Sequence, residues 1–219
     1  MGPVDRSSGH QQALVMPSGR MMRFCRGRLS LGSLFSRRHG KSFQSAPYYR
    51  VPDFLPVQEA QQVLQQLLEQ RHNFCIMSGQ RNFLRLPRPL EIQRVFFNRI
   101  RAVLPDIQER LAIDLEHSEV ELYVHAYNDG MHFDRHSDAH GGGNWRRRLS
   151  CVYYLHCLPR RFEGGQLVIY EGRKQAYAVE PEHNSMVFFR SHLIHEVLPV
   201  TCHSRAFVDS RFAINVWIL

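Results

Sequence analysis

Two potential metal ligands stand two residues apart near the middle of the chain, in the segment His136-Ser137-Asp138. Residues at this spacing in a β-strand point to the same face, so the imidazole and the carboxylate could bind one ion. A third ligand, His195, stands at the start of a later predicted strand. Two histidines and one carboxylate on one face of an iron ion leave positions open for oxygen and a chelating co-substrate. These three residues therefore predict a non-haem iron site.

The His-x-Asp pattern is a weak signal when it stands alone. The chain has 13 histidines, and His132 and Asp134 repeat the spacing four residues before His136. The choice between the two pairs therefore depends on the surrounding sequence and on the elements that would position each pair.

Those elements change in character near residue 119. Before it, apolar residues at spacings of three and four predict a helix over about 56–68 and a second over about 90–104, which Pro105 interrupts before a shorter helical piece near 107–111. After it, short runs of β-branched and aromatic residues between Gly, Pro and Asn predict strands, with no helices among them. The predicted strands are 119–127, 132–137, 148–157, 166–170, 175–179, 185–190, 194–200 and 210–218. Such a series predicts an antiparallel barrel or sandwich.

The net charge of +8 is concentrated at the N-terminus. Residues 1–46 hold eight Arg or Lys and a single acid, so the other 173 residues are close to neutral. The high pI thus describes a tail and not a binding face, which argues against a nucleic-acid partner. We interpret 1–46 as a disordered tail and 47–219 as one domain. The Arg- and Ser-rich composition of the tail leaves organelle targeting, or a later methionine as the true start, open.

The five cysteines form neither an even framework nor a CxxC pair. A reducing compartment, the cytoplasm, is therefore expected rather than secretion. No apolar run reaches the length of about 18 residues that a membrane-spanning helix needs, so we expect no membrane span. The oligomeric state is left open.

Further motifs flank the proposed ligands in a fixed order. Tyr127, Gly130 and Phe133 precede His136 at spacings of nine, six and three. After the ligands come the segments 148–155, 163–167, 184–189, His195 and 211–217. This series, over about residues 121–217, closely resembles the prolyl 4-hydroxylase-like branch of the iron(II)/2-oxoglutarate-dependent dioxygenases.

The resemblance implies a mainly β fold with flanking helices (α+β): a double-stranded β-helix, or jelly-roll, over 119–219, packed against N-terminal helical support over 55–115. It implies Fe(II) held by His136, Asp138 and His195, with 2-oxoglutarate and O2 as co-substrates and ascorbate (vitamin C) supporting activity. The reaction would hydroxylate an unactivated C–H bond, with release of succinate and CO2. A prolyl group, or another amino-acid or peptide substrate, is favoured.

The resemblance also implies a late-strand arginine that anchors the distal carboxylate of 2-oxoglutarate. A guanidinium can grip a carboxylate with two parallel hydrogen bonds, and Arg205 and Arg211 are the candidates. In the strand 210–218, Arg211 shares one face with Ala213, Asn215 and Trp217, and the other face is apolar. We therefore choose Arg211 and keep Arg205, which is close to the usual family spacing, as the alternative.

Four more residues are candidates for ligand contacts. Tyr127 and Tyr154 match family positions that hydrogen-bond 2-oxoglutarate, although a strand tyrosine is as often a packing residue. Trp217 and Asn215 are candidates for substrate contact, because they share the face of Arg211. In Gly164-Gly165, the glycines would serve a hairpin turn or a close backbone approach.

Three other functions remain open. The two arginines six residues apart also occur in a nucleic-acid demethylase branch of the superfamily. A cupin-type metal enzyme shares the architecture but does not need the late arginine. A non-catalytic β-barrel binding module would leave Asp138 and a lumen-facing arginine buried without a ligand, at a cost of several kcal/mol, roughly, for each ion.

Overall fold

The computed structural model describes residues 46–79, 81–86, 93–115, 119–139, 146–173 and 175–219. The described chain contains two α-helices, α1 (Val57–Glu69) and α2 (Gln93–Leu111). Its strands are β1 (Tyr48–Val51), β2 (Cys75–Met77), β3 (Arg81–Leu86), β4 (Val120–Tyr127), β5 (His132–His136), β6 (Leu149–Leu155), β7 (Glu163–Gly164), β8 (Leu167–Glu171), β9 (Gln175–Val179), β10 (Ser185–Arg190), β11 (Ile194–Val197), β12 (Val200–Thr201) and β13 (Arg211–Ile218).

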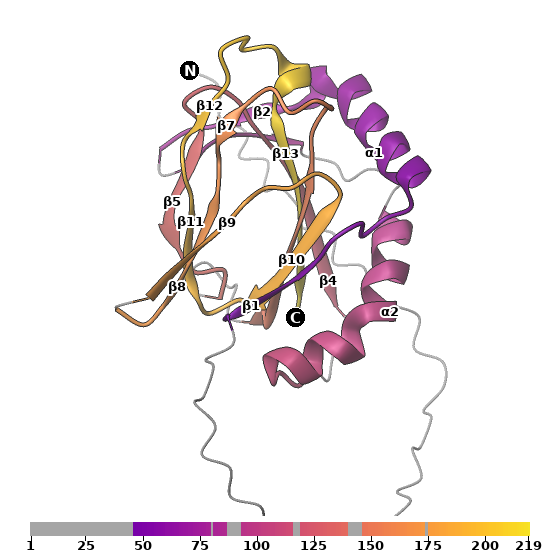
Figure 1. Cartoon of the computed structure of the whole chain (residues 1–219), viewed down its shortest axis with the longest axis vertical. Coiled ribbons are helices and arrows are strands. Elements are labelled where there is room, and N and C mark those ends of the chain that lie inside the picture. The colour runs from indigo at the N-terminus through magenta and orange to yellow at the C-terminus, as the bar shows by residue number, and fades with distance from the viewer. Residues whose placement is uncertain (1–45, 80, 87–92, 116–118, 140–145, 174) are drawn as a thin grey trace, which may run out of the picture.

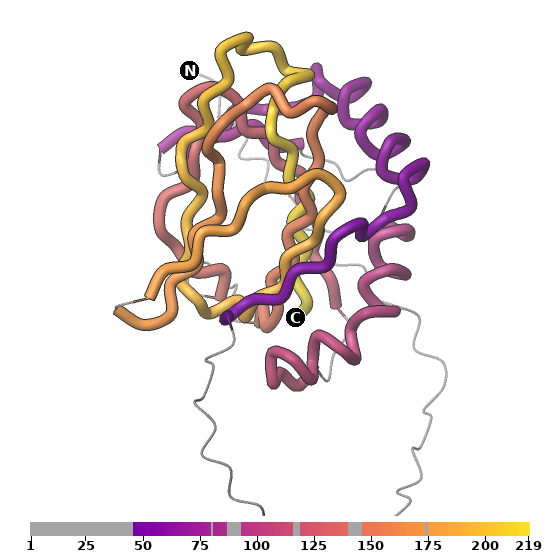
Figure 2. Tube along the Cα trace, viewed as in Figure 1, coloured from indigo at the N-terminus to yellow at the C-terminus, as the bar shows by residue number. Residues whose placement is uncertain are grey.

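Most strands pair antiparallel in two main sheets that β3 joins; β2 pairs with β3, and β7 and β12 form a separate two-stranded sheet. One sheet has the order β1-β10-β6-β13-β4, and the other has the order β5-β11-β8-β9. β3 pairs with β4 through residues 84–86 and with β5 through Arg81 and Asn82, so the path of strands passes from one sheet to the other. The tube in Figure 2 shows β1, from the start of the described chain, beside the much later β10. This curled arrangement confirms the predicted jelly-roll core.

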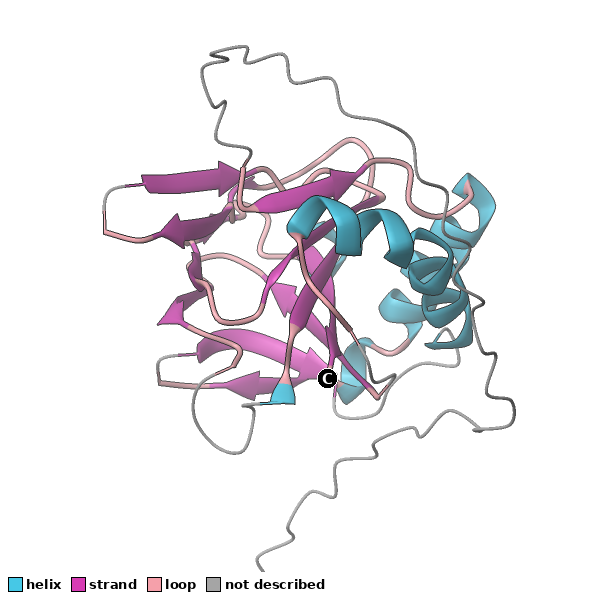
Figure 3. Ribbon diagram, turned by 90° about the horizontal axis from the view of Figure 1, so that it is seen from below, coloured by secondary structure: helices cyan, strands magenta, loops and turns pink. Residues whose placement is uncertain are grey.

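Both helices lie on one side of the sheets (Figures 1 and 3). The helices bury Ala60, Val63 and Phe96 against the first sheet.

β13 separates two apolar clusters, because its side chains alternate between its faces. Phe212 and Ile214 belong to the cluster under the helices, whereas Ala213 belongs to the cluster between the sheets.

The structure differs from the sequence prediction at several points. α2 is continuous through Pro105, which was expected to interrupt it. The helix bends within its length (Figure 1), which is how a helix accommodates the proline ring and the missing N–H. The segment expected to be helical support also contains β2 and β3, and β1 and β7 were not predicted. The strand predicted over 194–200 is interrupted at Leu198 and Pro199, which separate β11 from β12.

Other sequence predictions concern cysteines, membranes and the tail. Cys75, Cys151, Cys157 and Cys202 are free thiols. In the described part of the chain, no helix is long and apolar enough to cross a bilayer. The predicted tail, apart from Ala46, lies outside the described residues.

Phe54 is fully buried where the helices meet the first sheet. Its ring lies 5.9 Å from the ring of Tyr153, 6.3 Å from Phe188 and 6.4 Å from Phe96. We expect Phe54→Ala to lower the free energy of unfolding by about 3–5 kcal/mol, because it removes this contact and leaves a cavity. Urea denaturation measures the loss. The control is Val57→Ala, at a side chain that is 67% exposed, and a similar effect of both changes would contradict this packing.

Candidate active site

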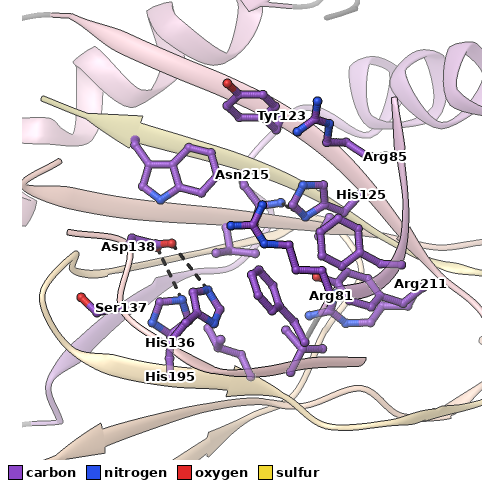
Figure 4. Close-up of a pocket in the computed structure, with 18 of the residues that line it drawn as sticks. Arg81, Arg85, Tyr123, His125, His136, Ser137, Asp138, His195, Arg211 and Asn215 are labelled. Carbon is purple, nitrogen blue, oxygen red and sulfur yellow. Dashed lines mark hydrogen bonds and ion pairs between the residues drawn. The ribbon is translucent and has the colours of Figure 1, made fainter. Parts of the chain in front are cut away.

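The three predicted metal ligands converge on one point between the sheets (Figure 4). β5 and β11 pair so that His136 and His195 are direct partners across the strands. Asp138 follows two residues after β5. His136 Nε2 lies 3.6 Å from Asp138 Oδ1, and His195 Nε2 lies 3.5 Å from Asp138 Oδ2. One potential ligand atom from each residue falls within 4.8 Å of the others, a spacing that suits one bound ion.

Backbone carbonyl groups orient both imidazole rings. His136 Nδ1 lies 2.7 Å from the carbonyl oxygen of Asp134, and His195 Nδ1 lies 2.9 Å from that of Leu193. Each Nδ1–H can donate to its carbonyl, which leaves the Nε2 lone pair free to bind a metal. Burial lowers the pKa of His195, which favours the neutral form that metals bind, although Asp138 acts in the opposite direction.

The Asp138 carboxylate is buried and held by hydroxyl groups. Ser150 Oγ donates to Asp138 Oδ2 at 2.6 Å, and the hydroxyls of Ser150 and Ser191 are 2.9 Å apart. Burial alone would raise the pKa of Asp138, but His195 and hydrogen bonds from His136, Ser150 and Trp217 hold it below the usual range. The carboxylate is therefore charged, as a metal ligand must be.

Arg211 projects from the start of β13 into the same cavity, which has a volume of about 460 Å³. The side chain is 1% exposed, and its guanidinium lies over the rings of Tyr127 and Tyr154 at 4.8 and 4.9 Å. Among the described residues, none accepts a hydrogen bond from its three guanidinium nitrogens. A buried cation without a partner costs several kcal/mol, roughly, so this position is suited to an anion from outside the chain.

Two glycines make room beside Arg211. A Cβ at Gly165 would lie 2.8 Å from both Arg211 Cδ and Val200 Cγ2, and a Cβ at Gly164 would lie 2.3 Å from the carbonyl oxygen of Pro199. Both residues also have a positive φ, near +70°, which favours glycine. The Gly-Gly motif therefore allows β12 and the arginine to approach the backbone closely.

The other predicted contact residues are also near the cavity. Tyr127, Asn215 and Trp217 line it, and Trp217 is 8% exposed. Tyr154 is fully buried behind Arg211, and its hydroxyl has no partner among the described residues. A ligand anchored at Arg211 would give this hydroxyl a hydrogen-bond acceptor.

The two alternative assignments lie outside the cavity lining. Arg205 is 78% exposed, and its Nε donates to Asp129 Oδ2 at 3.0 Å. His132 lies 3.5 Å from Asp134, and neither residue lines the cavity. Arg211 therefore lines the cavity as the strand-face argument predicts, whereas Arg205 lies outside its lining.

The sequence analysis missed several cavity residues, among them Arg81, Arg85 and His125. Burial and the charges of the nearby arginines lower the pKa of His125 to about 3, so the ring is neutral. Asn215 Nδ2 donates to His125 Nδ1 at 3.0 Å, which places the ring proton on Nε2. The alternation of residues 123, 125 and 127 could have revealed His125, because all three lie on the face of Tyr127.

Comparisons with known proteins agree with this geometry. Residues 122–219 match the family model described as the 2OG-Fe(II) oxygenase superfamily. An uncharacterised PKHD-type hydroxylase from Synechocystis sp. is 29% identical over 80% of this chain, and the chain spans 64% of that relative's length.

Solved structures share the fold. A Pseudomonas putida prolyl-4-hydroxylase superposes with a TM-score of 0.62 at 22% identity, covering 79% of this chain and 92% of that one. A prolyl hydroxylase from Trichoplax adhaerens, solved with a hypoxia inducible factor peptide fragment, superposes with a TM-score of 0.58 at 20% identity, covering 79% of this chain and 83% of that one.

Ser150 can be tested as a residue that positions Asp138. We expect Ser150→Ala to weaken Mn²⁺ binding by about 10–100-fold, because Asp138 loses the donor that orients it. Calorimetric titration of the apoprotein measures the affinity. Ser185→Ala is the matched control, since this equally buried hydroxyl donates to the carbonyl oxygen of Glu182 instead. Equal Mn²⁺ affinities for the two variants would contradict the role of Ser150.

Proposed function

Because the chain belongs to the 2OG-Fe(II) oxygenase superfamily, we propose that it is a 2-oxoglutarate-dependent hydroxylase. One observation carries this proposal: a buried arginine without a protein partner shares a cavity with a His-Asp-His cluster. The cluster alone would suit many metal enzymes. The arginine adds a site for a carboxylate within the same cavity, and an iron enzyme that uses a keto diacid needs both.

Each part of the cavity has a role in this proposal. His136, Asp138 and His195 hold Fe(II), which supplies the oxygen activation and hydroxylation chemistry when it is bound with 2-oxoglutarate. Arg211 binds the distal carboxylate of 2-oxoglutarate through paired hydrogen bonds, and the Tyr154 hydroxyl donates to the same group. The apolar residues around them exclude water from the site.

The substrate in this proposal is an amino-acid or peptide group, with a prolyl group favoured, and Trp217 and Asn215 contact it. The PKHD-type name of the Synechocystis relative and the peptide bound by the Trichoplax enzyme support this class. The products are the hydroxylated group, succinate and CO2, and ascorbate sustains turnover.

Anaerobic titration with Fe(II) tests the proposal directly. We expect a visible charge-transfer band only when both Fe(II) and 2-oxoglutarate are present, and succinate formation once air is admitted with ascorbate. Asp138→Ala should abolish both signals, because the remaining two ligands bind iron weakly. A native protein that binds iron but gives neither the band nor succinate would refute the proposed activity.

Arg211→Ala separates the proposed enzyme from one that needs only the metal. Removing the partner of a buried anion costs about 3–5 kcal/mol, which corresponds to roughly two to three orders of magnitude in the apparent constant for 2-oxoglutarate. Fe(II) affinity should change far less. Arg211→Lys should recover only part of the loss, because an ammonium cannot form the two-pronged contact.

The exposed Arg205 provides the control for Arg211. We expect Arg205→Ala to leave the dependence of succinate formation on 2-oxoglutarate nearly unchanged. A severe loss in Arg205→Ala with a normal Arg211→Ala would instead transfer the anchor to Arg205.

A further inference from the structure

Two arginines of β3 line the cavity together with Arg211. Arg81 extends across the opening toward the metal ligands, and Arg85 lies near Tyr123 (Figure 4). The Arg81 guanidinium lies 5.6 Å from the centre of the Phe133 ring, and that of Arg85 lies 5.3 Å from the centre of Tyr123. Contact with an aromatic face leaves the N–H edges of a guanidinium free to bind an anion.

Neither arginine has an acidic partner within the described chain. The ion pairs found there involve other side chains. Arg147, which also lines the cavity, differs because it pairs with Glu121. Of the arginines that line the cavity, Arg147 is paired with an acidic residue. Arg81, Arg85 and Arg211 have no acidic partner in the described chain.

The proposed cofactors do not supply the missing negative charge. Fe(II) and Arg211 together bring three positive charges, and Asp138 with doubly charged 2-oxoglutarate brings three negative ones. Arg147 is matched by Glu121. Once the cofactors are bound, exposed Arg81 and half-buried Arg85 thus leave an excess of positive charge at the cavity, and the charge of Arg85 is screened less than it would be in bulk water.

Ring contacts connect this charge with the metal site. The Phe133 ring beneath Arg81 stacks on the ring of His136, with 3.7 Å between ring centres. His125 lines the same cavity, and the charges of Arg85, Arg211 and Arg81 all act on it. Its Nε2–H is a further donor in the cavity. An anion held by Arg81 would therefore lie beside the Phe133 ring that stacks on His136.

We propose that Arg81 and Arg85 form a subsite for a carboxylate of the substrate. The inference rests on the proposed hydroxylase function and narrows its substrate class to peptides with an acidic side chain next to the hydroxylated residue. A carboxylate is chosen over phosphate because the subsite lies inside the cavity beside the metal ligands, while the protein outside the tail is nearly neutral.

Two blocked tetrapeptides that differ in charge alone test this subsite: acetyl-Gly-Pro-Asp-Gly-amide and acetyl-Gly-Pro-Asn-Gly-amide. Their affinities are measured by calorimetry on protein loaded with Mn²⁺ and 2-oxoglutarate. We expect native protein to prefer the Asp peptide by about tenfold or more. The double variant Arg81→Gln/Arg85→Gln should bind both peptides equally. Arg173→Gln, at an exposed arginine in the turn after β8, should keep the preference.

The anaerobic Fe(II)/2-oxoglutarate band distinguishes the subsite from the proposed hydroxylase function. If the double variant gives the same band as the native protein, it is folded and binds its cofactors, so a lost preference comes from the subsite. Native protein that forms succinate but binds the peptides equally would overturn the subsite and keep the hydroxylase. Native protein that binds iron but gives neither the band nor succinate would overturn the hydroxylase itself. Tighter binding of a deoxythymidine trinucleotide than of the Asp peptide would assign the arginines to phosphate and overturn the carboxylate.

Discussion

The alternation of side chains along β13 is the constraint on which both the core and the cavity depend. The strand lies between β4 and β6, so its two faces contact different parts of the protein. Phe212 and the apolar residues in register with it support the helices, while Arg211 faces the metal ligands. A shift of one residue would bury the arginine in the outer core and turn the apolar side chains into the cavity. Stability and function are therefore set by the same pairing.

The site residues that the sequence analysis found can be recognised from residues close to them in the chain. His136 and Asp138 lie two residues apart, and the face of Arg211 follows from the pattern of a single strand. Arg205 is closer to the usual family spacing, but the structure places it outside the cavity lining. The period of the strand therefore predicts which arginine lines the cavity, whereas the distance along the chain does not.

The missed residues depend on contacts that are distant in the chain. Arg81 and Arg85 belong to the cavity because β3 pairs with both β4 and β5, about 40 to 50 residues later. A short run with alternating arginines does not by itself predict such pairing. Pro105 was misjudged for a related reason, because packing against the sheet stabilises α2 on both sides of the proline.

The pairing of β1 with β10 also has a consequence for handling the protein. β10 is bonded to β6 on one side and to β1 on the other, over residues 48–51. Without β1, the N–H and C=O groups of β10 would form an open sheet edge next to buried Phe188 and Phe189. Such an edge is a template for intermolecular strand addition. An expression boundary placed after residue 51 would therefore promote aggregation even though every cavity residue is retained.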